Sequence, residues 1–431
     1  MRNKIKKALL AVVCMLSCTS VFAYDFKVGG IYYSIVSLPD LTCEVSSGDN
    51  EYEGKVTIPA TVTYNNRTLT VTSIAESAFA YCRGLTSISI PNSVTSISRH
   101  AFDGCSGLTS VSIPNSVTYI GSSAFAYCRG LTSVSIGNSV KSIAESAFAH
   151  CSGLTSVSIP NSVTSISRHA FYGCSGLTSV NIPNSVEWID DYAFQSCSSL
   201  KRVIFEDGAS SLGMSDVSTN SGYYSYIFSY SIEYLYIGRN LINRNRWNSS
   251  SSPFYDLSSL KEVIIGDSVT TLNKYLFYKC KNLAKVVTGN SVTSIPQTAF
   301  SDCKSITSFT LGKSVSSVES QAFRDFSLTE LYSLNPTPPS VSSGNFSNKD
   351  YLDLNVYVPQ EALEAYQKAD VWKNFWNLQA LEPTAISATE ANYGVGIDTN
   401  AVAYDLNGRR VKGWQSTPGI YIINGKKVMV K

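Results

Sequence analysis

The sequence has little charge, few histidines and few long apolar stretches. Lys, Arg, Asp and Glu make up 15% of the 431 residues, whereas an ordinary soluble domain has about 25%. Residues 1–23 hold four of the 34 basic residues and no acidic one, so the rest of the chain has 30 basic and 32 acidic residues, a net charge of −2. Such a chain lacks the basic patch whose phosphate contacts supply most nucleic-acid affinity. We therefore exclude nucleic acid as a partner.

The N-terminus has the pattern of an export signal. Residues 1–23 combine a basic start, an apolar stretch from Ala8 to Leu16 and the cleavage-site pattern Val21-Phe22-Ala23. The apolar stretch is too short to cross a bilayer, and no later window of about 18 apolar residues exists. We expect a signal peptide over 1–23, a secreted or outer-surface protein, and no transmembrane span. An alternative is lipidation at Cys18.

A 23-residue repeat organises the middle of the chain. The unit at 108–130 reads LTSVSIPNSVTYIGSSAFAYCRG, and its eight apolar positions cannot form a core alone but form a continuous one when stacked on neighbouring units. Within each unit L-x-x-V-x-I predicts a strand, V-x-x-I predicts a second short extended segment, and A-F-x-x-C leaves room for at most one helical turn. The sequence predicts a β-rich solenoid of about eleven units with short parallel strands.

The repeated motifs resemble a known family. The L-x-x-L-x-L pattern with a following Asn resembles a leucine-rich repeat, and IPNSVTSI and AFxxCSGLTSV closely resemble BspA-like, Treponema-type surface proteins of Bacteroidetes, over about residues 73–335. The resemblance implies adhesion or ligand binding outside the cell, with no catalytic residues. The steps from Phe194 to Phe228 and from Phe228 to Phe254 are 34 and 26 residues, and these departures from 23 predict two extended loops.

The two ends differ from the repeats. Residues 24–72 predict an N-terminal β cap over the open core, and 336–381 a C-terminal cap with a strand, N-V-Y-V-P, and a helix over 360–376. Residues 382–431 resemble the end of a type IX secretion sorting domain, and their Asn-Gly pairs at 407–408 and 424–425 predict a small β-module. The alternative is a plain β-hairpin tail.

Phenylalanine and cysteine each recur in one register of the repeat. Since Ser231, Leu257 and Phe326 replace the cysteine in other units, we interpret this position as a core slot filled by free thiols. Disulfides are the alternative in an exported protein, and a metal site is not expected because no tetrahedral ligand set is complete. Cys43 lies outside the register. The predicted core ladder consists of Phe79, Cys82, Phe102, Cys105, Phe125, Cys128, Phe148, Cys151, Phe171, Cys174, Phe194 and Cys197.

Two regions are candidates for ligand binding. The outward positions of the L-x-x-V-x-I strands are nearly all Ser or Thr, and they provide either solubility without charge or a hydrogen-bonding platform. Residues 205–256 are rich in Tyr, Trp and Arg, the residue types that dominate binding hot spots. In Y-L-Y-I-G either alternate set of side chains could face inward. The candidate binding residues are Tyr223, Tyr224, Tyr226, Tyr230, Arg239, Arg244, Arg246 and Trp247.

The sequence contains no motif of the common hydrolase, metalloprotease, P-loop or dinucleotide-binding enzymes. His100 and His169 lie in identical S-R-H-A-F contexts 69 residues apart, which indicates duplication of three repeats rather than a catalytic pair. We expect a non-catalytic, monomeric or surface-attached protein that needs no cofactor and binds an extracellular protein or glycan. The alternatives are a glycan-binding accessory protein or enzyme of the cell surface, and a structural surface-layer component.

Overall fold

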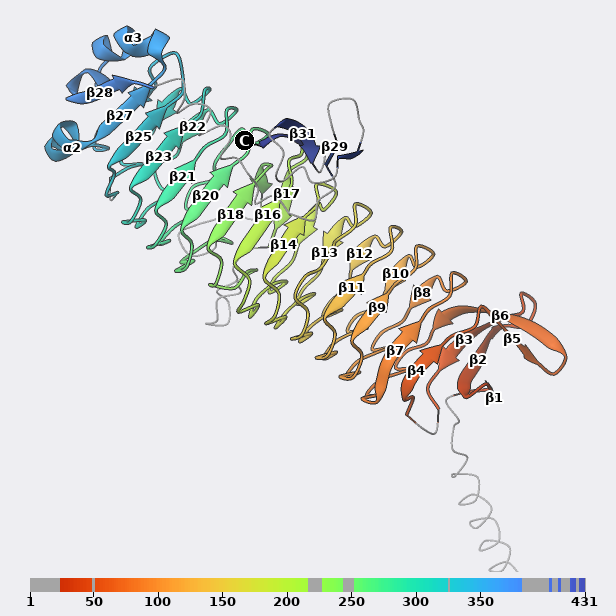
Figure 1. Cartoon of the computed structure of the whole chain (residues 1–431). Coiled ribbons are helices and arrows are strands. Elements are labelled where there is room, and N and C mark those ends of the chain that lie inside the picture. The colour runs from red at the N-terminus through yellow and green to blue at the C-terminus, as the bar shows by residue number, and fades with distance from the viewer. Residues whose placement is uncertain are drawn as a thin grey trace, which may run out of the picture.

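Successive 23-residue units wind into stacked coils that form an elongated solenoid (Figure 1). The computed structural model describes residues 24–48, 51–215, 227–242, 252–324 and 326–381, and four strands between 403 and 430. The predicted signal at 1–23, including Cys18, and most of the two predicted loops lie outside the described residues.

The L-x-x-V-x-I segments form one row of parallel strands, which we call the long sheet. Its last nine strands are hydrogen-bonded in an unbroken order from β14 to β28, and the earlier strands continue the same line in shorter pieces. The strands are β4 (Gly54–Thr57), β7 (Leu85–Ser89), β9 (Ser110–Ser112), β11 (Ser133–Ser135), β14 (Ser179–Ile182), β16 (Arg202–Phe205), β18 (Tyr234–Ile237), β20 (Glu262–Ile265), β21 (Lys285–Val287), β23 (Ser308–Leu311), β25 (Glu330–Ser333), β27 (Asn355–Val358) and β28 (Asn377–Ala380).

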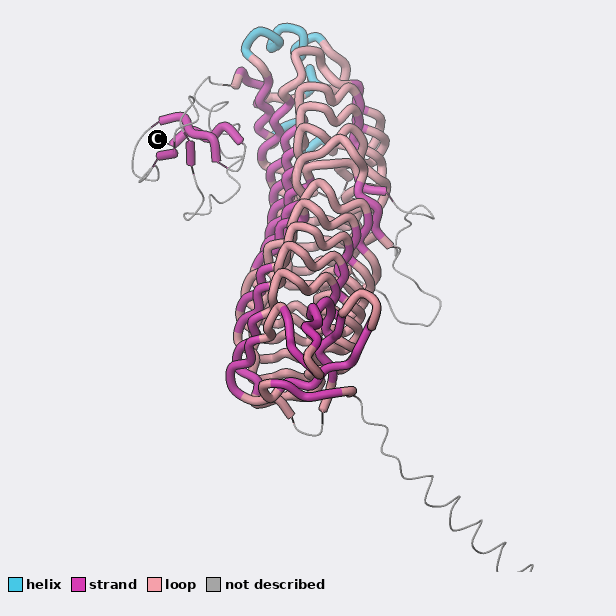
Figure 2. The backbone as a smooth tube through the Cα atoms, turned by 90° about the vertical axis from the view of Figure 1, so that its right-hand side faces the viewer, coloured by secondary structure: helices cyan, strands magenta, loops and turns pink. Residues whose placement is uncertain are grey.

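The V-x-x-I segments form a second row of short parallel strands on another side of the solenoid (Figure 2). In the two-residue strands from β8 to β15 the second side chain, such as Ile97 or Ile120, points into the core. These strands are β8 (Ser96–Ile97), β10 (Tyr119–Ile120), β12 (Ser142–Ile143), β13 (Ser165–Ile166), β15 (Trp188–Ile189), β17 (Leu212–Met214), β19 (Leu241–Ile242), β22 (Ser294–Ile295), β24 (Ser317–Val318) and β26 (Ser340–Val341).

Other elements close the two ends of the solenoid. The N-terminal end carries β1 (Phe26–Val28), β2 (Ile31–Ser37), β3 (Thr42–Ser46), β5 (Thr61–Tyr64) and β6 (Arg67–Ile74). β1, β2 and β3 pair antiparallel, and β3 joins β6 in parallel, so this group continues into the second row of strands. The ring of Tyr52 lies 4.5 Å from that of Phe79 and covers the first core phenylalanine.

The C-terminal end contains short helices, not the continuous helix that 360–376 predicts. The chain forms α2 (Asn348–Asp353), η1 (Gln360–Ala362), α3 (Leu363–Lys368) and η2 (Trp372–Asn374). The prediction of one helix is wrong because α3 already ends at Lys368: Ala369 is extended, with φ of −77° and ψ of 143°, and Val371 then adopts a left-handed φ of 72° before η2 begins. Trp372 is nevertheless buried and donates from Nε1 to the carbonyl oxygen of Pro339 at 2.7 Å.

Beyond the cap, four strands form a separate antiparallel sheet: β29 (Ala403–Tyr404), β30 (Arg410–Val411), β31 (Gly419–Ile423) and β32 (Lys426–Val430). β31 and β32 pair with Ile423 opposite Lys426.

A single stack of phenylalanine rings runs through the core. From Phe79 to Phe300 neighbouring rings are stacked with centroids 4.9 to 6.0 Å apart. The rings of Phe194, Phe228 and Phe254 are still neighbours, at 5.6 and 6.0 Å, although the sequence steps between them are longer than 23 residues. The longer sequence steps therefore leave the stack of rings unbroken.

The A-F segment is a tight turn in the described repeats and not a helix. In the regular coils from Phe79 to Phe194, the residues two positions before and after the phenylalanine adopt left-handed backbone conformations, such as Ser123 and Tyr127, both with φ of 57°, around Phe125. This geometry points backbone N–H groups along the solenoid axis, and Phe125 N donates to the carbonyl oxygen of Ala147 in the next coil at 2.8 Å. Each turn thereby hydrogen-bonds to its neighbour as a strand does.

The repeated cysteines are free, buried thiols. Cys128 Sγ donates to the carbonyl oxygen of Phe102 in the preceding coil at 3.1 Å, and Cys151 Sγ makes the same contact with Phe125. Burial is the main cause that raises the pKa of Cys82 to about 11 and that of Cys197 to about 12. Within the described residues no group of three His, Cys, Asp or Glu side chains could hold a metal ion.

We predict that the native protein resists thiol alkylation. Burial keeps these thiols protonated and out of reach, and the thiolate is the reactive form. Iodoacetamide at neutral pH should modify almost none of the nine cysteines of residues 24–431 in the folded protein and all nine after denaturation, as counted by intact-mass spectrometry. Rapid native modification of the repeat cysteines, or fewer than nine reactive thiols after denaturation without reductant, would contradict the free thiol ladder.

Candidate binding surface

From β7 to β27, one outward position of each long-sheet strand lies in the same register, and strand pairing aligns these positions, together with Ser158 of an isolated bridge, into a row along the solenoid. We call it the outward row. It consists of Ser89, Ser112, Ser135, Ser158, Asn181, Ile204, Tyr236, Ile264, Val287, Thr310, Tyr332 and Tyr357. The row has a polar half up to Asn181 and a mostly apolar half from Ile204 onward.

The polar half lines a shallow groove. The four serines from Ser89 to Ser158 are exposed, and together with the turns that follow the strands they border a groove of about 690 Å³. Asn115 Oδ1 accepts from the backbone N of Asn138 at 2.8 Å, which fixes one wall of the groove. The groove offers hydroxyl and amide groups without charge and spans four coils.

The apolar half carries a small hydrophobic cluster outside the main core. Tyr236, Ile264 and Val287 pack together, with Ile204 and Tyr234 beside them. Tyr236 donates from its hydroxyl to Asp207 Oδ1 at 2.6 Å. This orientation resolves the ambiguity of Y-L-Y-I-G, because Leu235 and Ile237 face the core and both tyrosines face outward.

Aromatic and cationic side chains continue this surface. The guanidinium of Arg202 lies 3.9 Å from the centroid of the Tyr234 ring, and the rings of Tyr332 and Tyr357 stack with centroids 4.8 Å apart. Aromatic rings beside a guanidinium provide apolar contact and hydrogen bonding at the same place, as binding hot spots do.

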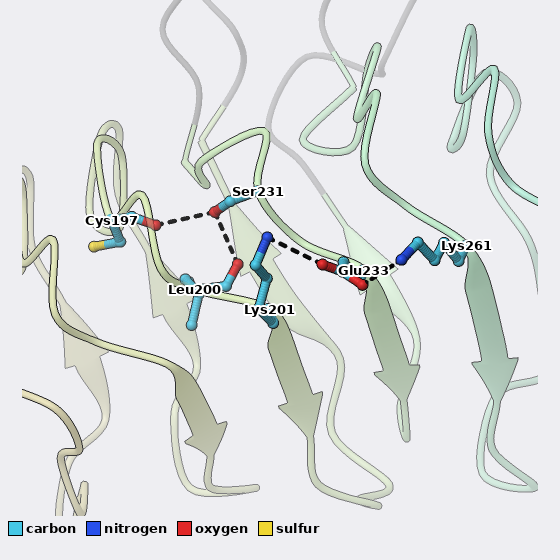
Figure 3. Close-up of polar contacts among 6 residues, drawn as sticks. All are labelled: Cys197, Leu200, Lys201, Ser231, Glu233 and Lys261. Carbon is cyan, nitrogen blue, oxygen red and sulfur yellow. Dashed lines mark hydrogen bonds and ion pairs between the residues drawn. The ribbon is translucent and has the colours of Figure 1, made fainter.

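Charged residues bridge the coils next to this region (Figure 3). Glu233 lies between Lys201 and Lys261 of the two adjacent coils, at 3.0 and 2.6 Å. Each of these three residues directly follows the core Leu or Ile that begins the strand motif, a position that holds threonine in earlier coils. There the threonine hydroxyl bonds to the preceding coil, as Thr132 donates to the carbonyl oxygen of Thr109. The lysine pairs lower the pKa of Glu233.

Ser231 occupies the cysteine position of the irregular unit. Its hydroxyl donates to the carbonyl oxygens of Cys197 and Leu200, at 3.0 and 2.8 Å (Figure 3). The predicted core slot thus holds a hydroxyl here that shares its one proton between two carbonyl oxygens of the preceding coil.

The structure describes two of the eight predicted binding residues. Tyr230 is exposed, with 41% of its surface accessible. Arg239 is 0% exposed, so the prediction that it contacts a ligand at the surface is wrong. The other six residues lie outside the described residues and remain predictions: Tyr223, Tyr224, Tyr226, Arg244, Arg246 and Trp247.

Arg239 is buried because it takes the place of a turn serine as the donor to the carbonyl oxygen of Val186. In regular coils a turn serine donates to the valine carbonyl of the preceding coil, as Ser185 does to Val163 at 2.8 Å. The coil after Val186 differs, and Arg239 reaches across it to donate to the carbonyl oxygens of Pro183, Asn184 and Val186 at 2.7 to 2.9 Å. Burial lowers the pKa of Arg239 to about 10, and Glu206 acts in the opposite direction.

A strip of rings on the turn side of the solenoid is a surface that the sequence reasoning missed. Tyr127 stacks on His150, and His169 stacks on Tyr192, with centroids 4.6 and 4.9 Å apart, while Tyr172 lies edge-on to both histidines. The sequence feature that could have revealed this strip is the recurrence of aromatic residues two positions before and after the core phenylalanine. Burial, with Arg129 for His150 and Arg168 for His169, lowers the pKa of both histidines.

Comparison with known proteins identifies relatives of the whole repeat region. The family model described as "BspA type Leucine rich repeat region (6 copies)" matches residues 72–201, 118–243 and 248–366. A leucine-rich repeat protein from Bacteroides ovatus is 25% identical over 83% of this chain and 100% of its own, with a TM-score of 0.42. No protein with a curated description matches.

Two further solved structures are similar. A leucine rich cell surface protein from Faecalibacterium prausnitzii is 22% identical over 83% of this chain and 94% of its own, with a TM-score of 0.39. The leucine rich repeat protein of T. pallidum is 28% identical over 42% of this chain and 81% of its own, with a TM-score of 0.38. Among the described residues, no helix is both long and apolar enough for a membrane span.

We predict that Arg239→Met destabilises the protein by about 3 kcal/mol, because it removes three charged hydrogen bonds and leaves the buried carbonyl oxygen of Val186 without its side-chain donor, while Pro183 O keeps only the backbone N of Val186. The matched control is Arg168→Met, which removes a guanidinium 5.5 Å from the Tyr192 ring at the surface and should cost no more than about 1 kcal/mol. Urea unfolding followed by circular dichroism measures both. Equal stability of the two variants would contradict the role assigned to Arg239.

We predict that the two stacked histidines make the protein less stable in acid. Their pKa values are lowered in the folded state, so the unfolded chain binds more protons and stability falls as pH drops below the ordinary histidine pKa of about 6.5. The double variant His150→Asn/His169→Asn keeps residues that tolerate the left-handed backbone. Between about pH 7.5 and 5.5 the urea midpoint of this variant should fall less than that of the wild type. An equal fall of the midpoint in both proteins would refute the prediction.

Proposed function

Since the chain belongs to the BspA-type leucine-rich repeat family, we propose that it is an exported surface protein that binds an extracellular macromolecule through the outer face of the long sheet. The outward row carries this proposal. It forms one continuous line of side chains that the core does not use, and its chemistry changes from hydroxyl to aromatic and aliphatic along the solenoid.

Binding by such a surface is distributed over many coils. Each coil contributes one or two side chains about 4.8 Å from the next, so a long partner makes many weak contacts whose sum gives the affinity. Aromatic residues and Arg202 supply the strongest contacts. The protein acts on its partner by holding it, without catalysis. An extracellular protein fits the exposed serines of the polar half, and the half-buried stacked rings of Tyr332 and Tyr357 extend the contact surface.

A glycan is the second candidate partner, favoured by the groove alone. The groove is uncharged and lined by regularly spaced hydroxyl and amide groups, which suit the hydroxyls of a neutral polysaccharide. A purely structural surface-layer role is the third possibility.

Export and surface attachment complete the proposal. The signal-like residues 1–23 direct the chain out of the cytoplasm, and the segment 382–431, which resembles a type IX sorting domain, directs it to the outer surface. The insert residues around 216–226 and 243–251 add a second set of contacts to the same partner.

We predict that a bulky charge in the groove weakens binding. The variant Ser112→Arg/Ser135→Arg places two arginines in the groove and should lower binding to immobilised extracellular-matrix proteins by about tenfold. The control Tyr119→Arg changes an exposed residue of the second row of strands and should leave binding unchanged.

The same variants are tested on a glycan array. Loss of glycan binding with no matrix-protein binding would select the glycan alternative. Binding that survives the groove variant would remove the groove from the interface, and no binding on either surface would favour the structural role.

A further inference from the structure

The apolar half of the outward row is buried although it points away from the core. Tyr236, Ile264 and Val287 are 7%, 3% and 7% exposed, whereas Ser135 at the same register is exposed. These side chains pack on one another, and Tyr236 reaches along the sheet past Gly266 to Asp207. An apolar sheet face of this kind is typically completed by a second layer that packs on it.

We propose that the antiparallel sheet β29–β32 docks on the apolar half of the outward row. A sheet of four short strands needs another layer against which to bury a face. In Figure 2 the long sheet runs along one side of the solenoid, and the strands beside the marked C-terminus lie on that side. Figure 1 likewise shows β29 and β31 next to the middle of the solenoid, and not beyond its C-terminal cap.

The chain is long enough for this docking. Five strand steps separate β28 from β20, a distance of about 24 Å at the usual strand spacing. Residues 382–402 connect the cap to β29, and 21 residues can extend about 70 Å. The connection therefore reaches the cluster without stretching.

The charges are complementary. Residues 403–431 contain six basic residues and one acidic residue. Three carboxylates lie at the ends of the strands beside Tyr236: Glu206, Asp207 and Asp267. The lysines of this surface lie at the opposite ends of the strands, where Lys261 and Lys285 are paired with Glu233 and Glu262. Opposite charges around an apolar contact orient the two surfaces and disfavour other placements.

Docking divides the outward row into an open and a covered part. The polar groove stays accessible, whereas the apolar half becomes accessible only when the C-terminal sheet leaves or is removed. This consequence rests on the proposed function, because it concerns which half of the face a partner can reach. The docking itself does not require a ligand.

Lysine cross-linking of the full chain tests the docking. With a short amine-reactive cross-linker and peptide mass spectrometry, Lys426 and Lys427 should link to Lys261 and Lys285 beside the cluster. They should not link to Lys141, which lies among the N-terminal coils. Links spread evenly over these lysines, or concentrated on Lys141, would overturn the proposal.

A paired variant gives the second readout. Ile264→Ser/Val287→Ser installs the serine that natural coils carry at this register, so the fold tolerates it, as circular dichroism will verify. Loss of the apolar contact should lower the specific cross-links about tenfold and raise nitration of Tyr236, with exposed Tyr127 as the internal reference. The control Ser112→Ala/Ser135→Ala should change neither. Unchanged cross-links and nitration in the paired variant would refute the docking.

The two proposals fail separately. Cross-links spread evenly over the lysines, in a protein whose groove still binds its partner, would refute only the docking. Specific links in a protein that binds neither matrix proteins nor glycans would refute the proposed function alone.

Discussion

The stacking of identical side chains between coils is the constraint on which the structure depends. Neighbouring coils are held at the strand spacing of about 4.8 Å, and a flat aromatic ring fills that distance when it stacks on its copy. The core rings from Phe79 to Phe300 do so at 4.9 to 6.0 Å. The small cysteine three residues later fits the remaining space, and its thiol satisfies the Phe carbonyl of the coil before. Phenylalanine, cysteine and the left-handed turn around them therefore form one unit of packing.

This constraint explains why long inserts leave the solenoid intact. The stack requires that Phe194, Phe228 and Phe254 keep their places relative to one another, but it does not limit the length of chain between them. What an insert disturbs is the hydrogen bonding of the adjacent turns. Ser231 and Arg239 restore it with donors of different length from those of the regular coils. Buried polar side chains thus supply the hydrogen bonds that the turns of the irregular unit would otherwise lack. This explains why an arginine in a Tyr-rich segment lies inside the protein.

The sequence predicted the solenoid and its core well because both follow from periodicity. The 23-residue spacing identifies which residues stack, and Phe125 and Cys128 are buried where their register places them. It failed at Arg239, where composition was the only guide, and over 360–376, where the helical spacing of apolar residues does not reveal the extended Ala369 and the left-handed Val371. Enrichment in Arg cannot distinguish a surface contact from a buried donor, since that depends on carbonyls of residues far away in the sequence. The change in the outward row was visible at Ile204, Tyr236 and Ile264, but only strand register shows that these residues form one line.

Periodicity also limits where specificity can arise. The segments at 75–80 and 98–102 recur at 144–149 and 167–171, so duplication has copied their surfaces together with their core. Coils produced in this way carry the same outward serine, and a surface made of copies cannot distinguish one end of a partner from the other. Asymmetry begins at Ile204, where the row becomes apolar, and coincides with the irregular coils that contain Ser231 and Arg239. Selection for a particular partner therefore acts most effectively where the repeat departs from its period, because the core there already tolerates change.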